Sequence, residues 1–167
     1  MPFSVFKNIN SLAGKSKILD MFAIFCAKYL LYFMLAYLFV YAFDIRSLRV
    51  FFFPLASGVF AAFVLNSIIY FFYKERRPAE FKSTKTLIAV PNNPSFPSRH
   101  SSLVFGISFC LFFYSPVLAL IFLMLSCLVA VARVFCGVHW FRDVLAGSIV
   151  GFISSLIVYN VLTYIFQ

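Results

Sequence analysis

Residues 117–166 read VLALIFLMLSCLVAVARVFCGVHWFRDVLAGSIVGFISSLIVYNVLTYIF, two long apolar runs joined by a short polar stretch. The runs cover 117–135 and 144–166, and each is long enough to cross a bilayer as one α-helix, which takes about 20 residues. Strands of a membrane barrel would instead alternate between apolar and polar residues. The stretch therefore predicts membrane-spanning helices with a polar connection, 133–143, at one membrane surface.

The composition of the whole chain predicts the same class of protein. Of its 167 residues, 63% are hydrophobic, 25 are Phe and only 11% are charged, which excludes a soluble domain with an ordinary polar surface. The net charge of +9 arises because 14 Lys and Arg face only five acidic residues. In a lipid-embedded protein such basic residues meet lipid phosphates, so we expect the bilayer as a partner and no nucleic acid. The four cysteines show neither a C-x-x-C pair nor the spacing of a zinc site.

Three further apolar runs precede this pair, at 21–43, 50–73 and 98–114. Residues 1–20 are predicted to form an interfacial segment, and Asp20 to cap the first span. Lys28 stands inside the first run and predicts either a later start of that span or a side chain that faces the bundle interior. Residues 79–97, rich in turn formers, are the one long connection. We therefore predict an all-α integral membrane protein, a single domain of residues 1–167 with about five transmembrane helices and an N-terminal interfacial helix.

Ionisable side chains cluster at three places, 74–80, 98–100 and 133–143. If each span crosses the membrane once, all three places emerge on the same face, whereas the opposite face offers only three charged residues between 44 and 49. Each cluster alone also fits a loop whose charges snorkel to the interface, but their common face favours one composite site. The predicted site comprises Lys74, Arg77, Ser98, Arg99, His100, Arg133, His139 and Asp143.

The residue types in this set suit the chemistry of a phosphoryl group. Arginine forks and a hydroxyl match the oxygens of a tetrahedral dianion and neutralise a phosphoryl transition state. Asp143 follows His139 by four residues, which on a helix places both on one face, so we expect the carboxylate to orient the imidazole. His139 is then the predicted nucleophile and His100 the acid. Ser98 stands at the start of a helix, where the free backbone N–H groups would point to an anion. The alternative is that Ser98 is a simple N-cap of this helix. Since no carboxylate cluster suited to magnesium or calcium occurs, we predict a reaction without metal or cofactor.

The spacing of these residues resembles the motifs of the type 2 phosphatidic acid phosphatases, also called lipid phosphate phosphatases. That family carries K-x6-R-P, P-S-G-H and S-R-x5-H-x3-D in this order. Here the second motif reads Pro97-Ser-Arg-His100 and the third reads Ala132-Arg-x5-His139-x3-Asp143. The resemblance covers most of the chain and implies His139 as nucleophile, Asp143 as its partner, His100 as acid, and Arg77, Ser98, Arg133 and the backbone of Arg99 as phosphate ligands.

Three positions depart from the family pattern. The family lysine seven residues before Arg77 falls on Tyr70, and Lys74 stands three residues before Arg77, on the same helix face, as its expected substitute. The glycine of the second motif is Arg99, which keeps the backbone donor and adds a charge that would suit a second phosphate. The serine before the motif arginine is Ala132, which removes a hydroxyl.

Within the family, the small size and the non-glycine residue of the second motif are similar to bacterial undecaprenyl diphosphate phosphatases. The resemblance implies hydrolysis of undecaprenyl diphosphate to undecaprenyl phosphate. The lipid A 1-phosphatases have motifs that cannot be separated from these, so hydrolysis of lipid A 1-phosphate or of phosphatidylglycerol phosphate stays an alternative. A protein that binds or transports a lipid phosphate without turnover is the non-enzymatic alternative, and the sequence carries no signal for the oligomeric state.

Two arguments disagree about the side of the membrane on which the site lies. Most basic residues outside the spans are on the predicted site face, which by the positive-inside rule would be cytoplasmic. The resemblance implies the extracytoplasmic side, and a lipid phosphatase has a separate reason to concentrate bases where its substrate binds. We therefore expect a multi-pass protein of the cytoplasmic (inner) membrane with its active site on the extracytoplasmic (periplasmic) face.

Overall fold

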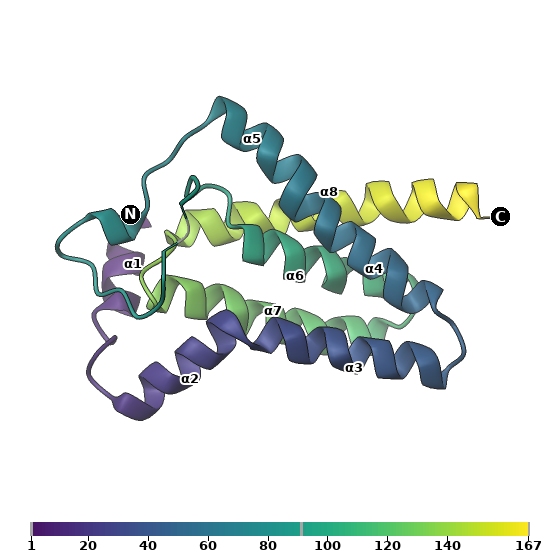
Figure 1. Cartoon of the computed structure of the whole chain (residues 1–167), viewed down its shortest axis with the longest axis horizontal. Helices are drawn as coiled ribbons and strands as arrows, with labels where there is room; N and C mark the ends of the chain where they lie inside the picture. The colour runs from purple at the N-terminus through teal and green to yellow at the C-terminus, as the bar shows by residue number, and fades with distance from the viewer. Residues whose placement is uncertain (1, 91, 167) are drawn as a thin grey trace.

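The computed structural model describes residues 2–90 and 92–166, and their regular elements are all helical (Figure 1). These are α1 (Pro2–Asn10), α2 (Lys17–Lys28), α3 (Leu30–Asp44), α4 (Arg49–Val59), the π-helix η1 (Phe60–Leu65), α5 (Asn66–Phe72), the 3-10 turn η2 (Pro78–Glu80), α6 (Arg99–Cys110), the 3-10 turn η3 (Leu111–Phe113), α7 (Pro116–Phe135) and α8 (Phe141–Ile165). In this described part of the chain, three helical segments are long and apolar enough to cross a membrane, namely α4 to α5, α7 and α8. The bent pair α2 and α3 makes a fourth if it is one span, and α6 with η3 is a shorter apolar helix. The structure thus confirms an all-α membrane protein with several spanning helices.

Helix α6 is the centre of the bundle, because it packs against α4, α7 and α8. Small residues allow these helices to approach closely, and a β-carbon added at Gly151 of α8 would lie only 2.6 Å from the backbone nitrogen of Gly106 in α6. Val104 and Ile107 of α6 are both fully buried. Large apolar side chains on the outer surfaces of the spans are exposed, as expected of surfaces that face lipid.

The first predicted span is broken near Lys28. Helices α2 and α3 meet at an angle of 52°, and a new helix starts at Leu30. The Lys28 side chain is exposed at this break, so it does not face the bundle interior. The prediction that Asp20 caps the span is wrong, since Ser16 is the N-cap of α2. Asp20 lies inside the first turn of α2, and its carboxylate reaches back to accept the N–H of Gly14 at 3.0 Å.

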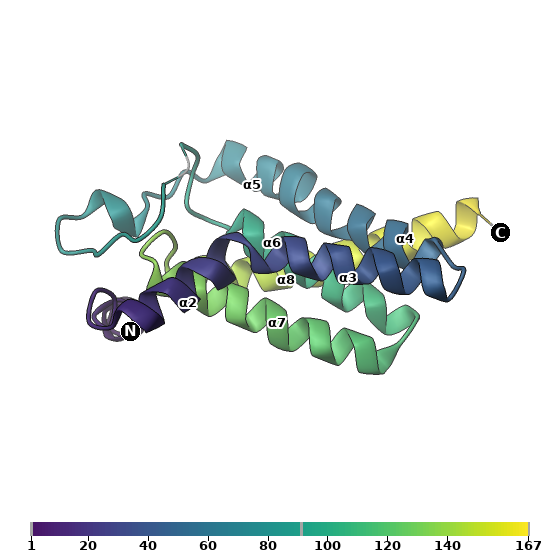
Figure 2. The same ribbon diagram turned by 60° about the horizontal axis from the view of Figure 1, so that its bottom comes forward.

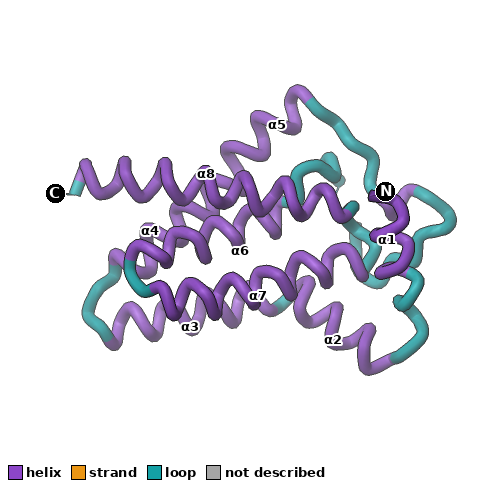
Figure 3. The backbone as a smooth tube through the Cα atoms, turned by 180° about the vertical axis from the view of Figure 1, so that it is seen from behind, coloured by secondary structure: helices purple, strands orange, loops and turns teal. Residues whose placement is uncertain are grey.

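The segments that carry the predicted site gather at one end of the bundle. The C-terminal end of α7, the N-terminal ends of α6 and α8, and the connection from α5 to α6 all lie at this end in both views (Figure 1 and Figure 2). Seen from behind, the longest loop and helix α1 lie there too, while the link from α3 to α4 and the C-terminus lie at the opposite end (Figure 3). The three clusters inferred from parity therefore share one end of the bundle.

Helix α1 holds the polar connection between α7 and α8 in place. Phe6 packs edge-on against Trp140, with ring centroids 4.8 Å apart. The buried Asn10 donates to the carbonyl oxygens of Lys85 and Phe135 at 2.8 and 2.9 Å, and it accepts the N–H of Lys85 at 3.0 Å. One amide side chain thus ties α1, the long loop and the end of α7 together.

Candidate active site

His139 lies in the turn between α7 and α8, and it is only 2% exposed. Its Nδ1 lies 3.0 Å from the carbonyl oxygen of Ser95. Because a carbonyl only accepts, Nδ1 carries the hydrogen and Nε2 keeps its lone pair. Burial, and then the charges of Arg133 and Arg77, lower the pKa of His139 well below its ordinary value of 6.5. The ring is therefore neutral at neutral pH, which is the state that a nucleophile needs.

Asp143 reaches His139, but not from a shared helix. Helix α8 begins at Phe141, so His139 precedes the helix, and the expectation that one helix presents both side chains is wrong. The Asp143 Oδ2 lies 3.5 Å from the His139 Nδ1, which is long for a hydrogen bond. The same oxygen accepts the N–H of Trp140 at 2.9 Å and the hydroxyl of Ser95. The carboxylate thus acts on the imidazole by its charge, and through Ser95, whose carbonyl accepts the Nδ1 hydrogen.

Arg77, which is 3% exposed, uses all five of its N–H donors inside the protein. Its Nε donates to the Asn93 carbonyl at 3.0 Å, and its Nη2 donates to the Asn93 Oδ1 at 2.8 Å and to the Pro94 carbonyl at 3.2 Å. Its Nη1 donates to the Val138 carbonyl at 2.8 Å and lies 3.2 Å from the Nε2 of His139. Arg77 therefore clamps the long loop to the turn that carries His139, and it contacts the Nε2 of His139.

Two other arginines keep buried donors without a partner. Arg133, near the end of α7, donates from Nη1 to the Ala27 carbonyl at 3.3 Å, while its buried Nε has no partner. The Nε of Arg99, in the first turn of α6, is likewise buried and unpaired. Leaving such a donor unsatisfied costs about 1–3 kcal/mol, so both groups are suited to an anion with several acceptor oxygens.

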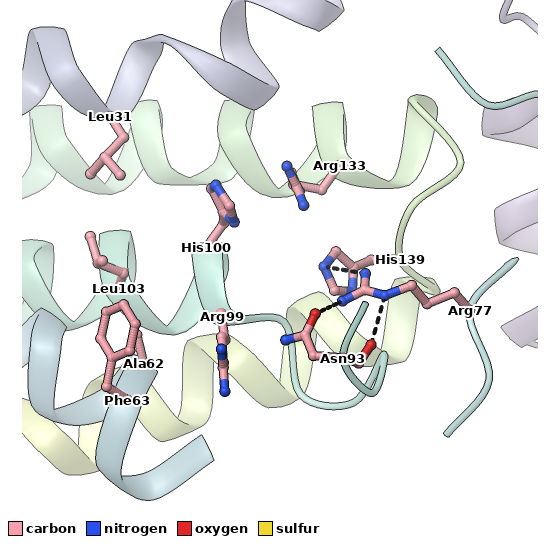
Figure 4. A pocket seen from close by; sticks show the side chains of 10 residues that line it. All are labelled: Leu31, Ala62, Phe63, Arg77, Asn93, Arg99, His100, Leu103, Arg133 and His139. Carbon is pink, nitrogen blue, oxygen red and sulfur yellow. Dashed lines mark hydrogen bonds between the residues drawn. The ribbon is translucent and has the colours of Figure 1, made fainter. Parts of the chain in front are cut away.

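These side chains line one cavity of about 330 Å³ (Figure 4). Its polar wall consists of Arg77, Asn93, Arg99, His100, Arg133 and His139, and its apolar wall of Leu31, Ala62, Phe63 and Leu103. Figure 4 shows the apolar residues at one end and Arg133, His139 and Arg77 at the other. Nowhere in residues 2–90 and 92–166 do three His, Cys, Asp or Glu side chains gather as ligands for a metal ion. The cavity thus has a cationic end and an apolar end, which together suit a lipid with an anionic head.

Besides Asp143, two of the predicted residues, Ser98 and Lys74, do not line this cavity. Ser98 is buried as the N-cap of α6, where its hydroxyl accepts the Ser101 N–H at 3.5 Å and its own N–H donates to the Asp143 carbonyl at 3.0 Å. Lys74 is exposed and borders a separate open hollow beside Arg77. The structure thus brings five of the eight predicted side chains into one cavity, with Asp143 and Ser98 directly behind it and Lys74 outside.

Sequence reasoning missed Ser95 and Asn93. Both act partly through backbone carbonyls, which accept from His139 and Arg77. Every residue has a backbone carbonyl, so the residue type does not predict which carbonyl accepts a given hydrogen bond. The available signal was the position of both residues in the turn-rich segment before the second motif.

The helical bundle and its cationic cavity define the protein as a membrane-bound lipid phosphatase. The chain belongs to the PAP2 superfamily, whose family model matches residues 51–167. The resemblance to the type 2 phosphatidic acid phosphatases is therefore confirmed.

Two curated relatives match nearly the whole chain. The chain is 31% identical over 158 residues to the bacitracin transport permease protein BcrC of Bacillus licheniformis, covering 92% of this chain and 77% of the relative. It is 26% identical over 162 residues to the undecaprenyl-diphosphatase BcrC of Bacillus subtilis (strain 168), covering 96% and 83%.

Two solved structures share the fold. One is LpxE of Aquifex aeolicus, with a TM-score of 0.72, 24% identity and coverage of 95% of this chain and 94% of that chain. The other is a transmembrane PAP2 type phosphatidylglycerolphosphate phosphatase from Bacillus subtilis, with a TM-score of 0.65, 20% identity and coverage of 97% and 86%. At these identities the likeness concerns the helical membrane fold.

Proposed function

We propose that this protein hydrolyses undecaprenyl diphosphate to undecaprenyl phosphate and inorganic phosphate, through a phosphohistidine on His139 and without a metal. The observation that carries the proposal is the placement of His139, whose Nδ1 is held by the Ser95 carbonyl and which lines a cavity with arginines at one end and apolar side chains at the other. The name of the Bacillus subtilis relative, undecaprenyl-diphosphatase, supports this choice of substrate.

The geometry suggests how the reaction proceeds. The lone pair of the His139 Nε2 forms a bond to the terminal phosphorus while the bridging P–O bond breaks, and the bridging oxygen leaves on the lipid phosphate. The Nδ1 hydrogen stays on the ring, held by the Ser95 carbonyl, and the nearby Asp143 carboxylate stabilises the cation that forms. Water then attacks the phosphohistidine, His100 takes its proton, and His139 is regenerated.

The phosphate ligands follow from the free donors. Arg133 offers its unpaired Nε, and Arg77 can exchange its contact with the His139 Nε2 for a phosphate oxygen. Ser98 shapes the N-terminus of α6, whose backbone N–H groups, including that of Arg99, favour an anion. Lys74 has no role in this proposal, because it lies outside the cavity.

Phosphate release from undecaprenyl diphosphate by the purified protein, with a chelator present, tests the reaction. We expect turnover in the wild type and none in His139→Ala. A requirement for added metal, or activity that survives His139→Ala, contradicts the mechanism. Faster turnover of lipid A 1-phosphate or phosphatidylglycerol phosphate in the same assay contradicts the choice of substrate but not the mechanism.

A lipid-phosphate binding or transport protein is the second candidate function, since the Bacillus licheniformis relative is named a transport permease. Binding of undecaprenyl diphosphate without phosphate release favours it. The proposed catalytic pair of His139 and His100 in one cavity favours hydrolysis instead.

We further propose that residues 1–167 form one membrane-embedded domain in the cytoplasmic membrane, with the cavity on the extracytoplasmic side. Single cysteines placed in the exposed part of the loop 79–97, for example at Lys82 or Thr86, can be labelled with an impermeant thiol reagent in a variant without native cysteines. Labelling in intact cells is expected. Labelling only after lysis places the site in the cytoplasm.

A further inference from the structure

Arg99 lies between the two ends of the cavity. Figure 4 shows it with Arg133 and His139 on one side and the apolar residues, including Leu103, on the other, and with its side chain pointing away from that of His100. A lipid whose terminal phosphate sits at His139 must therefore pass Arg99 before its chain reaches the apolar wall. The group next to Arg99 is the one that directly follows the phosphate under attack.

The Arg99 side chain is held in a defined place. Its guanidinium carbon lies 4.9 Å from the centroid of the Tyr70 ring and 5.7 Å from that of the Phe63 ring, both within the range of cation–π contacts. The Tyr70 ring is itself fixed, because its hydroxyl donates to the Pro97 carbonyl at 2.7 Å. The buried Nε of this pre-oriented guanidinium has no partner, so it is available to an acceptor oxygen of a ligand.

Tyr70 and Arg99 are also two of the three positions where the chain departs from its family motifs. A lysine is expected at 70 and a glycine at 99, so the tyrosine removes one cation and the arginine adds another. The two departures meet in space, since the tyrosine ring supports the arginine. The pair thus moves a cation from α5 to the N-terminus of α6 and keeps it beside the cavity.

We propose that Arg99 binds the lipid-linked phosphate of a diphosphate substrate and makes the site selective for diphosphates over monophosphates. The inference rests on the proposed function and deepens it. When His139 attacks the terminal phosphorus of a diphosphate, the bridging oxygen leaves as part of a phosphate whose last pKa is about 6, so it needs charge stabilisation rather than a proton. When the substrate is a monophosphate, the leaving oxygen belongs to an alcohol and needs a proton from a general acid. A fixed cation at this place therefore favours the diphosphate.

Arg99→Gln, assayed on undecaprenyl diphosphate and undecaprenyl phosphate, tests this inference. We expect kcat/KM to fall roughly 10- to 100-fold for the diphosphate, the equivalent of one charge-assisted contact, and to change less than about threefold for the monophosphate. Arg76→Gln is the matched control, because the Arg76 side chain is exposed. If the monophosphate turns over too slowly to measure, the inhibition constants of a long-chain alkyl bisphosphonate and monophosphonate give the same comparison.

A second variant separates the inference from a simple loss of charge. Tyr70→Lys combined with Arg99→Gly restores the family residues at these two positions, and it is expected to lower the preference for the diphosphate at least tenfold while the protein stays monodisperse in detergent. An equal loss on both substrates in Arg99→Gln, no loss on the diphosphate, or an unchanged preference in the double variant overturns the role of Arg99. If the wild type releases phosphate from neither substrate, the proposed function itself has failed.

Discussion

Replacing Arg77 by lysine distinguishes a clamp from a simple phosphate ligand. Arg77 makes five hydrogen bonds or close contacts with the long loop and the His139 turn, and lysine has only three donors on one nitrogen. At least two contacts are therefore lost, each worth about 1.5–3 kcal/mol because the donor is charged. We expect a loss of about 3 kcal/mol, which is a factor of roughly 150 in kcat/KM if it falls on the reacting geometry.

The measurement is phosphate release in detergent, combined with the thermal unfolding midpoint of the same samples. Because a clamp holds the ligand-free protein, Arg77→Lys should lower both the activity and the midpoint. The matched control is Arg76→Lys, whose exposed side chain should tolerate the change. If Arg77→Lys keeps the wild-type midpoint and loses only affinity for phosphate, Arg77 is a ligand and the reasoning from its internal contacts is refuted.

Three further predictions concern the turn that carries His139. Because burial lowers the pKa of His139 in the folded protein, this histidine binds a proton below about pH 6.5 only when the chain is unfolded. The wild type should therefore lose stability relative to His139→Gln as the pH falls below about 6.5. Gly137→Ala should destabilise the protein by more than about 2 kcal/mol, because φ is 74° and the new β-carbon would lie 2.3 Å from a backbone oxygen of the long loop. Its control is Gly14→Ala, where φ is 75° but the nearest atom is 3.7 Å away. Asn10→Ala removes three hydrogen bonds and should cost about 2–4 kcal/mol, whereas Asn8→Ala, at an exposed position of the same helix, should cost little.

Thermal unfolding in detergent across pH 5 to 8 checks the first of these, and a constant difference between the wild type and His139→Gln would contradict it. For the glycines, equal effects at both positions would mean that backbone strain alone matters and the loop contact does not. For the asparagines, equal unfolding midpoints of both variants would show that the ties made by Asn10 contribute nothing to stability.

The spanning helices and the common face of the three motifs were predictable because both depend on local properties. A run of about 20 apolar residues can satisfy its backbone in lipid only as a helix, and successive crossings alternate between the two faces. The apolar runs and their parity therefore placed residues 74–80, 98–100 and 133–143 at one end before any tertiary contact was known.

The boundaries inside that end were less predictable. Asp20 was expected to cap α2, but Ser16 does so. His139 was expected on the helix of Asp143, but α8 begins only at Phe141. In α2 and α8 alike, an aspartate (Asp20 or Asp143) fits more than one position in the first turn of a helix. The neighbouring loop decides at which residue the helix begins.

By itself, the sequence determined the membrane class, the helical fold and the cavity residues Arg77, Arg99, His100, Arg133 and His139, since these depend on residue type, run length and spacing. Only the tertiary structure decided how these residues divide their donors. It directs all five N–H groups of Arg77 into the protein, leaves one buried donor free on each of the other two arginines, and excludes Lys74 from the cavity. The physical reason is that partners such as the Ser95 and Asn93 carbonyls are backbone groups, which every residue carries, so only the folded path of the chain selects which of them meets a given side chain.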